Sequence, residues 1–287
     1  MGDASFNAEA IEAWNGVLFD KWVRFRHLLT DGLAEHGDAV LAAHPPAEGA
    51  HVLDLGCGIG DTTQTIARMI GPRGLAVGVD AAERFISVAR EDAAAAGVQN
   101  VRFEVVDVQS GPLGGPYDQA FSRMGIMFFA SPVIALRNVR RALRPAGMLA
   151  AVVWRRREDN PWLHDAQLAV EALVPHPGES DQPTCGPGPF SMSSPDLVSA
   201  QLLAAGFVRP TFERHEHDIR IGLDLEEAIE FAMALGPAGE LLRLAGAEAE
   251  PLRPQVLSAL REVLSRYAGP DGVVAPSSTW IITARAP

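Results

Sequence analysis

Cysteine is scarce in this chain, and long apolar runs and an excess of basic charge are absent. Two cysteines among 287 residues are too few for a disulfide framework and suit a reducing cytoplasm. No stretch approaches the ~18 uninterrupted apolar residues of a membrane-spanning helix, and residues 1–10 lack the basic and apolar regions of a signal peptide. The net charge of −12 disfavours a general nucleic-acid binder, whose affinity comes mainly from Lys and Arg on phosphates. We therefore expect a cytoplasmic protein with no membrane span and no nucleic-acid partner.

The remaining composition predicts a folded globular chain. Apolar residues make up 47% of it, which is enough for a core and argues against disorder. The length fits one large domain, or one domain with a lid.

One stretch, residues 52–63, predicts a buried strand, a glycine turn and the start of a helix. The apolar residues that open it are typical of a central parallel strand. Gly56, Gly58 and Gly60 then allow positive φ and let a ligand approach the backbone without meeting a Cβ. Because apolar residues at helical spacing follow, the turn should lie at a helix N-terminus with free N–H groups.

The spacing within this turn separates it from other nucleotide-binding loops. A dinucleotide fingerprint needs Gly-x-Gly-x-x-Gly, but Asp61 stands where the last glycine belongs. A P-loop needs Gly-Lys-Ser/Thr, and the turn contains no lysine. Asp54, just before the turn, would repel a phosphate and attract an ammonium or sulfonium group. The turn therefore predicts a ligand that is cationic at one end.

The turn resembles motif I of the class I S-adenosylmethionine-dependent methyltransferases, through residues 54–60 (Asp-Leu-Gly-Cys-Gly-Ile-Gly). The next strand, residues 75–79, ends in Asp80. Asp80 follows the turn by about 20 residues, which is the separation at which an acidic residue reaches a ribose diol in nucleotide-binding βαβ units. Residues 101–107 are similar to the family's third strand, whose terminal aspartate hydrogen-bonds the adenine amino group.

Two further segments carry the resemblance. Residues 143–149 (Leu-Arg-Pro-Ala-Gly-Met-Leu) resemble the family's turn into strand five, with Ala146 in place of its first glycine. Residues 122–129 (Ser-Arg-Met-Gly-Ile-Met-Phe-Phe) are similar to a bacterial small-molecule subgroup related to the ubiquinone and menaquinone biosynthesis enzymes. They depart from the Asn/Asp-Pro-Pro-Tyr/Phe motif of DNA methyltransferases and many protein N-methyltransferases, which disfavours nucleic-acid amino groups as acceptors.

The resemblance covers roughly residues 49–154 and implies S-adenosylmethionine as the cofactor. It implies an α/β fold: a Rossmann-like, seven-stranded, mostly parallel sheet with an antiparallel last strand, helices on both faces, a helical N-terminal segment and a helical cap. We expect a helical lid at 1–48, the cofactor-binding core at 49–156, a variable loop, helix and strand six at 157–222, and the cap with strand seven at 223–287. Residues 175–195, rich in Pro and Gly, would form a substrate-recognition loop.

The cofactor site is expected at the carboxyl ends of the strands, where strand order reverses. Its predicted residues are Asp54, Gly56, Cys57, Gly58, Gly60, Thr62, Asp80, Ala81, Asp107, Val108, Ser122, Arg123 and Trp22. Cys57 is interpreted as a small side chain that fits the turn rather than a redox group. Arg123 has two interpretations. It could hold an acidic acceptor or the cofactor carboxylate, or it could form a structural ion pair.

The N-terminal segment also has two interpretations. Apolar residues at three- and four-residue spacing predict a helix over 8–31, and residues 35–43 predict a second, short one. The favoured interpretation is that the long apolar stripe packs on the core. In the alternative it folds over the cofactor and brings Asn15, Trp22 and His27 near the ligand. An aromatic face such as that of Trp22 suits a sulfonium or an apolar acceptor.

Substrate contacts are expected from the loops that follow strands four and five. The predicted substrate-binding residues are Met124, Met127, Asn160 and Trp162. Three arginines, residues 155–157, separate strand five from this last pair. A general base is needed only if the acceptor keeps its proton until attack, and His164 or His27 would then serve.

The long strand predicted over 207–221 carries a possible alternative site. Glu213, His215 and His217 share one of its faces. A metal site is one interpretation of this face, a solvated strand face is the preferred one, and we predict no bound metal.

The leading functional hypothesis is methyl transfer to a small molecule, with an oxygen atom of an apolar or aromatic metabolite as the favoured acceptor. A rival hypothesis keeps the cofactor but not the transfer: some proteins of this fold bind S-adenosylmethionine and catalyse cyclisation or other non-methylating steps. A non-catalytic binding module is weaker, because all four cofactor motifs, at residues 54–60, 75–80, 101–107 and 143–149, are present. A homodimer is left open.

Overall fold

One eight-stranded sheet organises the chain. The computed structural model describes residues 4–174 and 187–287, so most of the expected recognition loop, and Cys185 with it, lies outside the described residues. The strand order is β3-β2-β1-β4-β5-β8-β6, and β7 pairs with β8. The strands are β1 (His51–Leu55), β2 (Leu75–Asp80), β3 (Val101–Val105), β4 (Tyr117–Arg123), β5 (Leu143–Trp154), β6 (Val208–Gly222), β7 (Ala268–Gly269) and β8 (Gly272–Arg285).

The sheet confirms the predicted α/β class. Strands β1 to β5 pair in parallel, and β8 runs antiparallel to both β5 and β6. The sheet has eight strands rather than seven because the two-residue β7 forms a tight hairpin with the start of β8. Strand order reverses between β1 and β4, so the carboxyl ends of these two strands border the expected ligand crevice.

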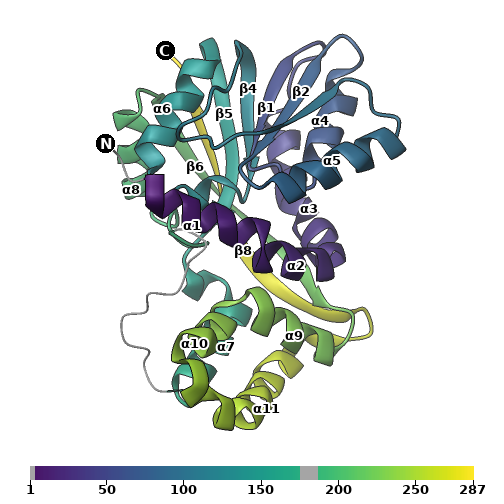
Figure 1. Cartoon of the computed structure of the whole chain (residues 1–287), viewed down its shortest axis with the longest axis vertical. Coiled ribbons are helices and arrows are strands. Elements are labelled where there is room, and N and C mark those ends of the chain that lie inside the picture. The colour runs from purple at the N-terminus through teal and green to yellow at the C-terminus, as the bar shows by residue number, and fades with distance from the viewer. Residues whose placement is uncertain (1–3, 175–186) are drawn as a thin grey trace.

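Helices lie on both faces of the sheet, and a separate group forms a lobe beyond its carboxyl edge (Figure 1). The helices are α1 (Ala4–Asn15), α2 (Val17–Arg24), α3 (Arg26–Ala43), α4 (Asp61–Ile70), α5 (Glu83–Ala95), α6 (Pro132–Ala142), α7 (Pro161–Glu171), α8 (Pro195–Ala204), α9 (Leu225–Leu235), α10 (Pro237–Ala245) and α11 (Arg253–Leu264), with short 3₁₀ helices η1 (Ile126–Phe128) and η2 (Arg157–Asp159). None of the described helices is long and apolar enough to cross a membrane.

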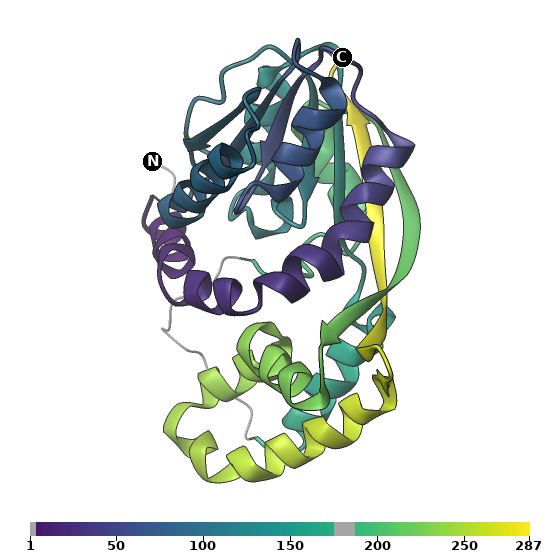
Figure 2. The same ribbon diagram turned by 90° about the vertical axis from the view of Figure 1, so that its right-hand side faces the viewer.

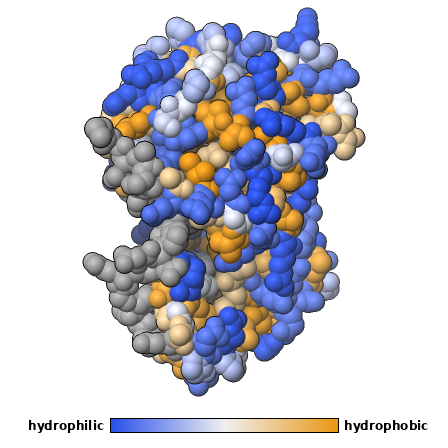
Figure 3. All heavy atoms as spheres, in the orientation of Figure 1, coloured by the Kyte–Doolittle hydropathy of each residue, from blue (hydrophilic) through white to orange (hydrophobic). Residues whose placement is uncertain are grey.

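The helical lobe is built from two parts of the sequence. Helix α7 precedes strand β6, yet it packs against α10 and α11. The long strands β6 and β8 run from the sheet down to this lobe and connect the two parts of the molecule (Figure 2). The face seen in Figure 3 is hollowed between the lobe and the core.

The expected break between two N-terminal helices near residue 32 is wrong, because α3 runs without interruption from Arg26 to Ala43. Its glycines serve close packing rather than helix ends. A Cβ added at Gly32 would lie 2.9 Å from the carbonyl oxygen of Arg220, and one at Gly37 would lie 2.9 Å from Cδ of Arg123. The observed breaks fall at Gly16 and Phe25 instead.

Candidate functional site

The glycine turn joins β1 to α4 in the conformation that its sequence predicts. Gly56, Gly58 and Gly60 all have positive φ, between 54° and 76°. A Cβ at Gly56 would lie 3.0 Å from Cα of Gly125, and one at Gly60 would lie 2.4 Å from the ring of Phe103. The backbone of the turn is therefore open to a ligand, and side chains are excluded from it.

Asp80 connects the end of β2 to this turn. Its Oδ2 accepts a hydrogen bond from the Gly58 N–H (3.1 Å), and its Oδ1 accepts one from the Ala82 N–H (2.9 Å). Burial raises the pKa of the carboxyl group, and the backbone hydrogen bonds oppose that rise. Asp80 thus lies beside the open turn, where a carboxylate oxygen has lone pairs left for ligand hydroxyls.

Asp54 faces the helix rather than solvent. It is 2% exposed, and its Oδ2 accepts a hydrogen bond of 2.6 Å from the Thr63 hydroxyl on α4. Burial raises the pKa of Asp54 to about 7, while Thr63 and Arg123 oppose the shift. The carboxyl group therefore fastens α4 to β1, and its direct contact with a cationic ligand stays a prediction.

Arg123 forms one of the two arrangements expected for it. Its Nη2 lies 2.6 Å from Oδ2 of Asp61, the first residue of α4, and the two side chains are only 14% and 24% exposed. The ion pair bridges the carboxyl end of β4 and the N-terminus of α4, across the mouth of β1. Neighbouring Ser122 is fully buried and donates to the Leu55 carbonyl (2.8 Å), which fastens β4 to β1.

Helices α1 and α2 cover the carboxyl ends of the strands (Figure 1). The Asn7 side chain on α1 donates a 2.6 Å hydrogen bond to Asp107, just after β3. Trp14 contacts Phe85 on α5 and Phe128 in η1, with ring centroids 6.2 and 5.2 Å apart. Because α5 follows β2 and η1 follows β4, and both strands flank β1, Trp14 spans the crevice above the glycine turn.

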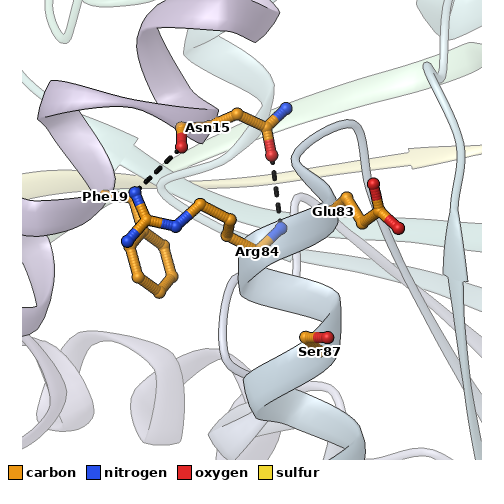
Figure 4. Close-up of a pocket in the computed structure, with 5 residues that line it drawn as sticks. All are labelled: Asn15, Phe19, Glu83, Arg84 and Ser87. Carbon is orange, nitrogen blue, oxygen red and sulfur yellow. Dashed lines mark hydrogen bonds between the residues drawn. The ribbon is translucent and has the colours of Figure 1, made fainter.

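The joint between α1 and α2 is anchored by Arg84. Its backbone N–H donates to Oδ1 of Asn15, its guanidinium donates to the Asn15 carbonyl (3.0 Å) and pairs with Asp20 (2.8 Å), and it lies 4.0 Å over the ring of Phe19. These contacts border an open pocket of about 530 Å³ (Figure 4). The pocket is lined by Asn15, Phe19, Glu83, Arg84 and Ser87. Asn15 thus contacts the helix anchor, and Figure 4 shows its side chain pointing to the start of α5.

Comparison with known proteins assigns the domain that holds this turn. Residues 46–175 match a family model described as a methyltransferase domain. The chain carries a class I S-adenosylmethionine-dependent methyltransferase domain. The match confirms the resemblance drawn from the four motifs and the cofactor that the resemblance implies.

The relatives of this methyltransferase domain include an enzyme of quinone biosynthesis. The chain is 28% identical over 106 residues to the demethylmenaquinone methyltransferase of Staphylococcus aureus. The aligned region is 37% of this chain and 43% of that protein. It is 32% identical over 121 residues to an uncharacterised 37.1 kDa protein in a Streptomyces fradiae transposon, and the aligned region is 42% of this chain and 34% of that protein. The chain thus spans less than half the length of these relatives. In fold it is similar to a candidate methyltransferase from Bacillus halodurans, with a TM-score of 0.56 at 16% identity over 90% of this chain and 99% of that one.

Several predicted residues pack around the turn of the methyltransferase domain. Cys57 is buried beside Phe103, and burial raises the pKa of its thiol well above the usual range, as expected for a small filler. Trp22 packs its ring on Phe85, 5.5 Å between centroids. Met124 holds a φ of 58°, unusual for a non-glycine residue, directly after β4. The remaining members, Thr62, Ala81, Val108 and Met127, lie buried or half-buried in the adjoining loops and helix starts.

Asn160 and Trp162, predicted to contact substrate, are engaged within the protein. Asn160 is fully buried; its Oδ1 accepts from the Ser278 N–H (2.8 Å) and its Nδ2 donates to the Ser278 carbonyl (3.2 Å). Trp162 is 4% exposed and stacks on Phe231 of α9 at 6.0 Å. The sequence placed this loop at the crevice, but these two side chains turn into the joint between the core and the helical lobe.

The two candidate bases lie on different elements. His27 on α3 is half-exposed, and its Nε2 is 3.0 Å from Oε1 of Glu227 near the start of α9. His164 is on α7, in the helical lobe (Figure 1). The structure does not bring the two histidines together, and a catalytic role for either stays a prediction.

The histidines of β6 are partly covered by a residue that the sequence did not single out. His36 on α3 is fully buried, 5.1 Å from the ring of His215, and its Nε2 lies 2.7 Å from Oγ of Ser277. His217 remains exposed and His215 is half-buried. The prediction of a solvated strand face is therefore correct for His217 and wrong for His215. Among residues 4–174 and 187–287, no group of three or more His, Cys, Asp and Glu side chains is placed to hold a metal ion.

Proposed function

We propose that this protein transfers the methyl group of S-adenosylmethionine to a small-molecule acceptor. One observation carries the proposal. The glycine turn of the methyltransferase domain is left-handed at three positions and is hydrogen-bonded to Asp80, so a Cβ-free backbone and a carboxylate adjoin the same opening. A cofactor with a ribose diol and a cationic end fits such an opening.

The residues proposed to hold the cofactor come from the carboxyl ends of four strands. Asp80 would accept from the ribose hydroxyls and Asp107 from the adenine amino group. Arg123 would hold the amino-acid carboxylate if it exchanges its bond to Asp61 for one to the ligand. When bound, S-adenosylmethionine supplies an electrophilic methyl group on a positively charged sulfur.

The protein contributes position and shielding to methyl transfer. The acceptor atom would form its bond to the methyl carbon as the carbon–sulfur bond breaks, and the electron pair of that bond would stay on the sulfur of S-adenosylhomocysteine. Holding the acceptor in line supplies about 7–11 kcal/mol as effective molarity. Residues 1–48, proposed as the lid, would exclude water through Trp14 and Trp22.

The finer identity of the acceptor is also proposed. Phenylalanine, methionine and tryptophan side chains near the crevice, such as Phe128, Met124 and Trp14, support an aromatic or apolar metabolite with an oxygen acceptor. For an acceptor that keeps its proton, His164 or His27 would act as base. The net charge of −12 supports a small-molecule partner over nucleic acid. The low cysteine content supports a cytoplasmic location. Light scattering would distinguish a monomer from a homodimer.

Calorimetric titration with S-adenosylmethionine and S-adenosylhomocysteine tests the site. We expect micromolar binding of both by the wild type, and at least tenfold weaker binding, about 1.4 kcal/mol, by Asp80→Ala. Asp271→Ala, an exposed carboxylate of the β7–β8 hairpin, is the matched control. Unchanged affinity of Asp80→Ala would refute the site. Acceptor conversion without formation of S-adenosylhomocysteine would replace methyl transfer by the non-methylating alternative.

A further inference from the structure

Three consecutive arginines follow strand β5, and they differ in their partners. Arg155 and Arg156 share one carboxylate, that of Asp159, at 3.1 and 3.4 Å. The Arg157 side chain has no ion pair and no hydrogen bond to any residue in the described ranges. Its Nε is buried from solvent and unpartnered. Of the three arginines, Arg157 is thus left without a counter-charge from the part of the chain that the structure describes.

Arg157 is held in place by an aromatic ring rather than by an anion. Its guanidinium carbon lies 5.1 Å from the centre of the Phe190 ring. Stacking on a ring holds the guanidinium plane and leaves its edge, a fork of N–H donors, available to a planar anion. A buried donor without a partner destabilises the free protein, so a ligand that satisfies it recovers that cost.

The arginine and the ring lie on the acceptor side of the crevice. Arg157 begins η2, shortly after β5. Ser191, next to Phe190, donates to the Met127 carbonyl in η1, shortly after β4. The same segment is fixed to β8 because the Trp280 Nε1–H donates to the Ser193 carbonyl (2.9 Å). The carboxyl ends of β4 and β5 meet at the edge of the sheet that holds the glycine turn. Arg157 therefore lies at the same edge of the sheet as the cofactor opening, on the side away from β2 and β3.

We infer that Arg157 and Phe190 bind an anionic, planar group of the methyl acceptor, so that the acceptor is an aromatic acid rather than a neutral metabolite. The inference rests on the proposed methyl transfer. The guanidinium fork would take the carboxylate with two parallel hydrogen bonds, and Phe190 would contact the adjoining ring. The hydroxyl that receives the methyl group would then point toward the glycine turn.

Matched pairs of hydroxybenzoic acids and hydroxybenzamides test the inference. Each pair presents the same ring and hydroxyl groups, with and without the negative charge. Binding to protein saturated with S-adenosylhomocysteine is measured by ligand-detected NMR, and formation of S-adenosylhomocysteine from S-adenosylmethionine is measured by chromatography. The wild type should prefer acids over amides by at least tenfold in both measurements.

Arg157→Gln should abolish that preference, while Arg156→Gln, an exposed neighbour in the same run, should keep it. Arg157→Lys should restore part of it, because the charge remains and the fork is lost. Because Arg157 has no counter-charge among residues 4–174 and 187–287, Arg157→Gln should unfold at the same or a higher temperature than the wild type.

Three results would overturn the inference: equal use of amides and acids by the wild type, a preserved preference in Arg157→Gln, or no binding of any acid to protein that binds S-adenosylhomocysteine. A protein that does not bind S-adenosylhomocysteine would contradict the proposed function itself, so the two failures are distinguishable.

Discussion

The side-chain amide of Asn7 donates a 2.6 Å hydrogen bond to the carboxylate of Asp107, one hundred residues away in the sequence. The same carboxylate also accepts from the Ser110 hydroxyl (2.8 Å) and the Gln109 N–H (3.0 Å). The family resemblance implies that Asp107 accepts a hydrogen bond from the adenine amino group. An amide N–H and an adenine N–H are both donors, so Asn7 and the cofactor would compete for one acceptor.

Removing the Asn7 amide should loosen helix α1 in the cofactor-free protein. A hydrogen bond to a charged group is worth about 1.5–3 kcal/mol, so Asn7→Leu should speed amide exchange over α1. It should also raise the association rate of S-adenosylhomocysteine several-fold in stopped-flow fluorescence. Glu9→Gln, an exposed change on the same helix, is the control. An association rate equal to that of the wild type would show that α1 does not limit entry.

Gly60 should tolerate alanine far less well than Gly97 does. Both have left-handed φ, 76° and 66°, so each substitution carries about 1–2 kcal/mol of backbone strain. At Gly60 the new Cβ also meets the Phe103 ring at 2.4 Å, whereas at Gly97 nothing lies within 4 Å. Overpacking adds about 1–3 kcal/mol, so denaturant unfolding should place Gly60→Ala below Gly97→Ala by that amount. Equal losses would mean that Phe103 moves freely and does not shape the turn.

Asp54 should make the fold less stable as the pH rises. Its pKa is raised from 3.8 to about 7, so the folded protein holds this proton more tightly than the unfolded chain. Stability therefore falls between those two pH values. Asp54→Asn keeps an acceptor for Thr63 and should stabilise the protein at pH 8, relative to its effect at pH 5, by more than about 1 kcal/mol. Thermal melts across this range test it, with Asp271→Asn as control. A pH-independent difference would contradict the assignment.

His36 should act in the opposite direction. Burial and the charges of His215 and His217 lower its pKa from 6.5 to about 3, so its contribution to stability is present above pH 6.5 and is lost as the pH falls toward 3. His36→Gln should reduce the slope of unfolding free energy against pH below 6.5 by up to about 1.4 kcal/mol per pH unit. His51→Gln, an exposed change at the start of β1, should keep the wild-type slope. An unchanged slope in His36→Gln would mean that His36 is not what makes the fold acid-sensitive.

The glycine turn could be predicted from sequence because its requirement is local. Positive φ at Gly56, Gly58 and Gly60 restricts those positions to glycine, and the carboxylates at Asp54 and Asp80 follow from strand ends that are visible as apolar runs. The order of strands follows from the same motifs, because parallel strands joined by helices permit few arrangements. The domain and its cofactor were therefore within reach of the sequence.

The directions in which loop side chains point could not be predicted from the sequence. Asn160 and Trp162 belong to a loop that the sequence correctly places after β5, yet they turn toward Ser278 and Phe231. Arg157, three residues earlier, has no anionic partner for its side chain among the described residues. A run of polar and aromatic residues leaves several partners open to each side chain. Folding decides among them, because it determines which groups come close enough to contact.

By itself, the sequence determined the glycine turn, the parallel strands around it and the cofactor class, since these depend on backbone conformation and on periodicity within short segments. The tertiary structure alone decided that Asn7 meets Asp107, that His36 lies beneath His215, and that α7 joins α10 and α11. Those contacts join residues that are distant along the chain, and no local pattern records a distant partner. They form only when the burial of apolar surface brings the elements together.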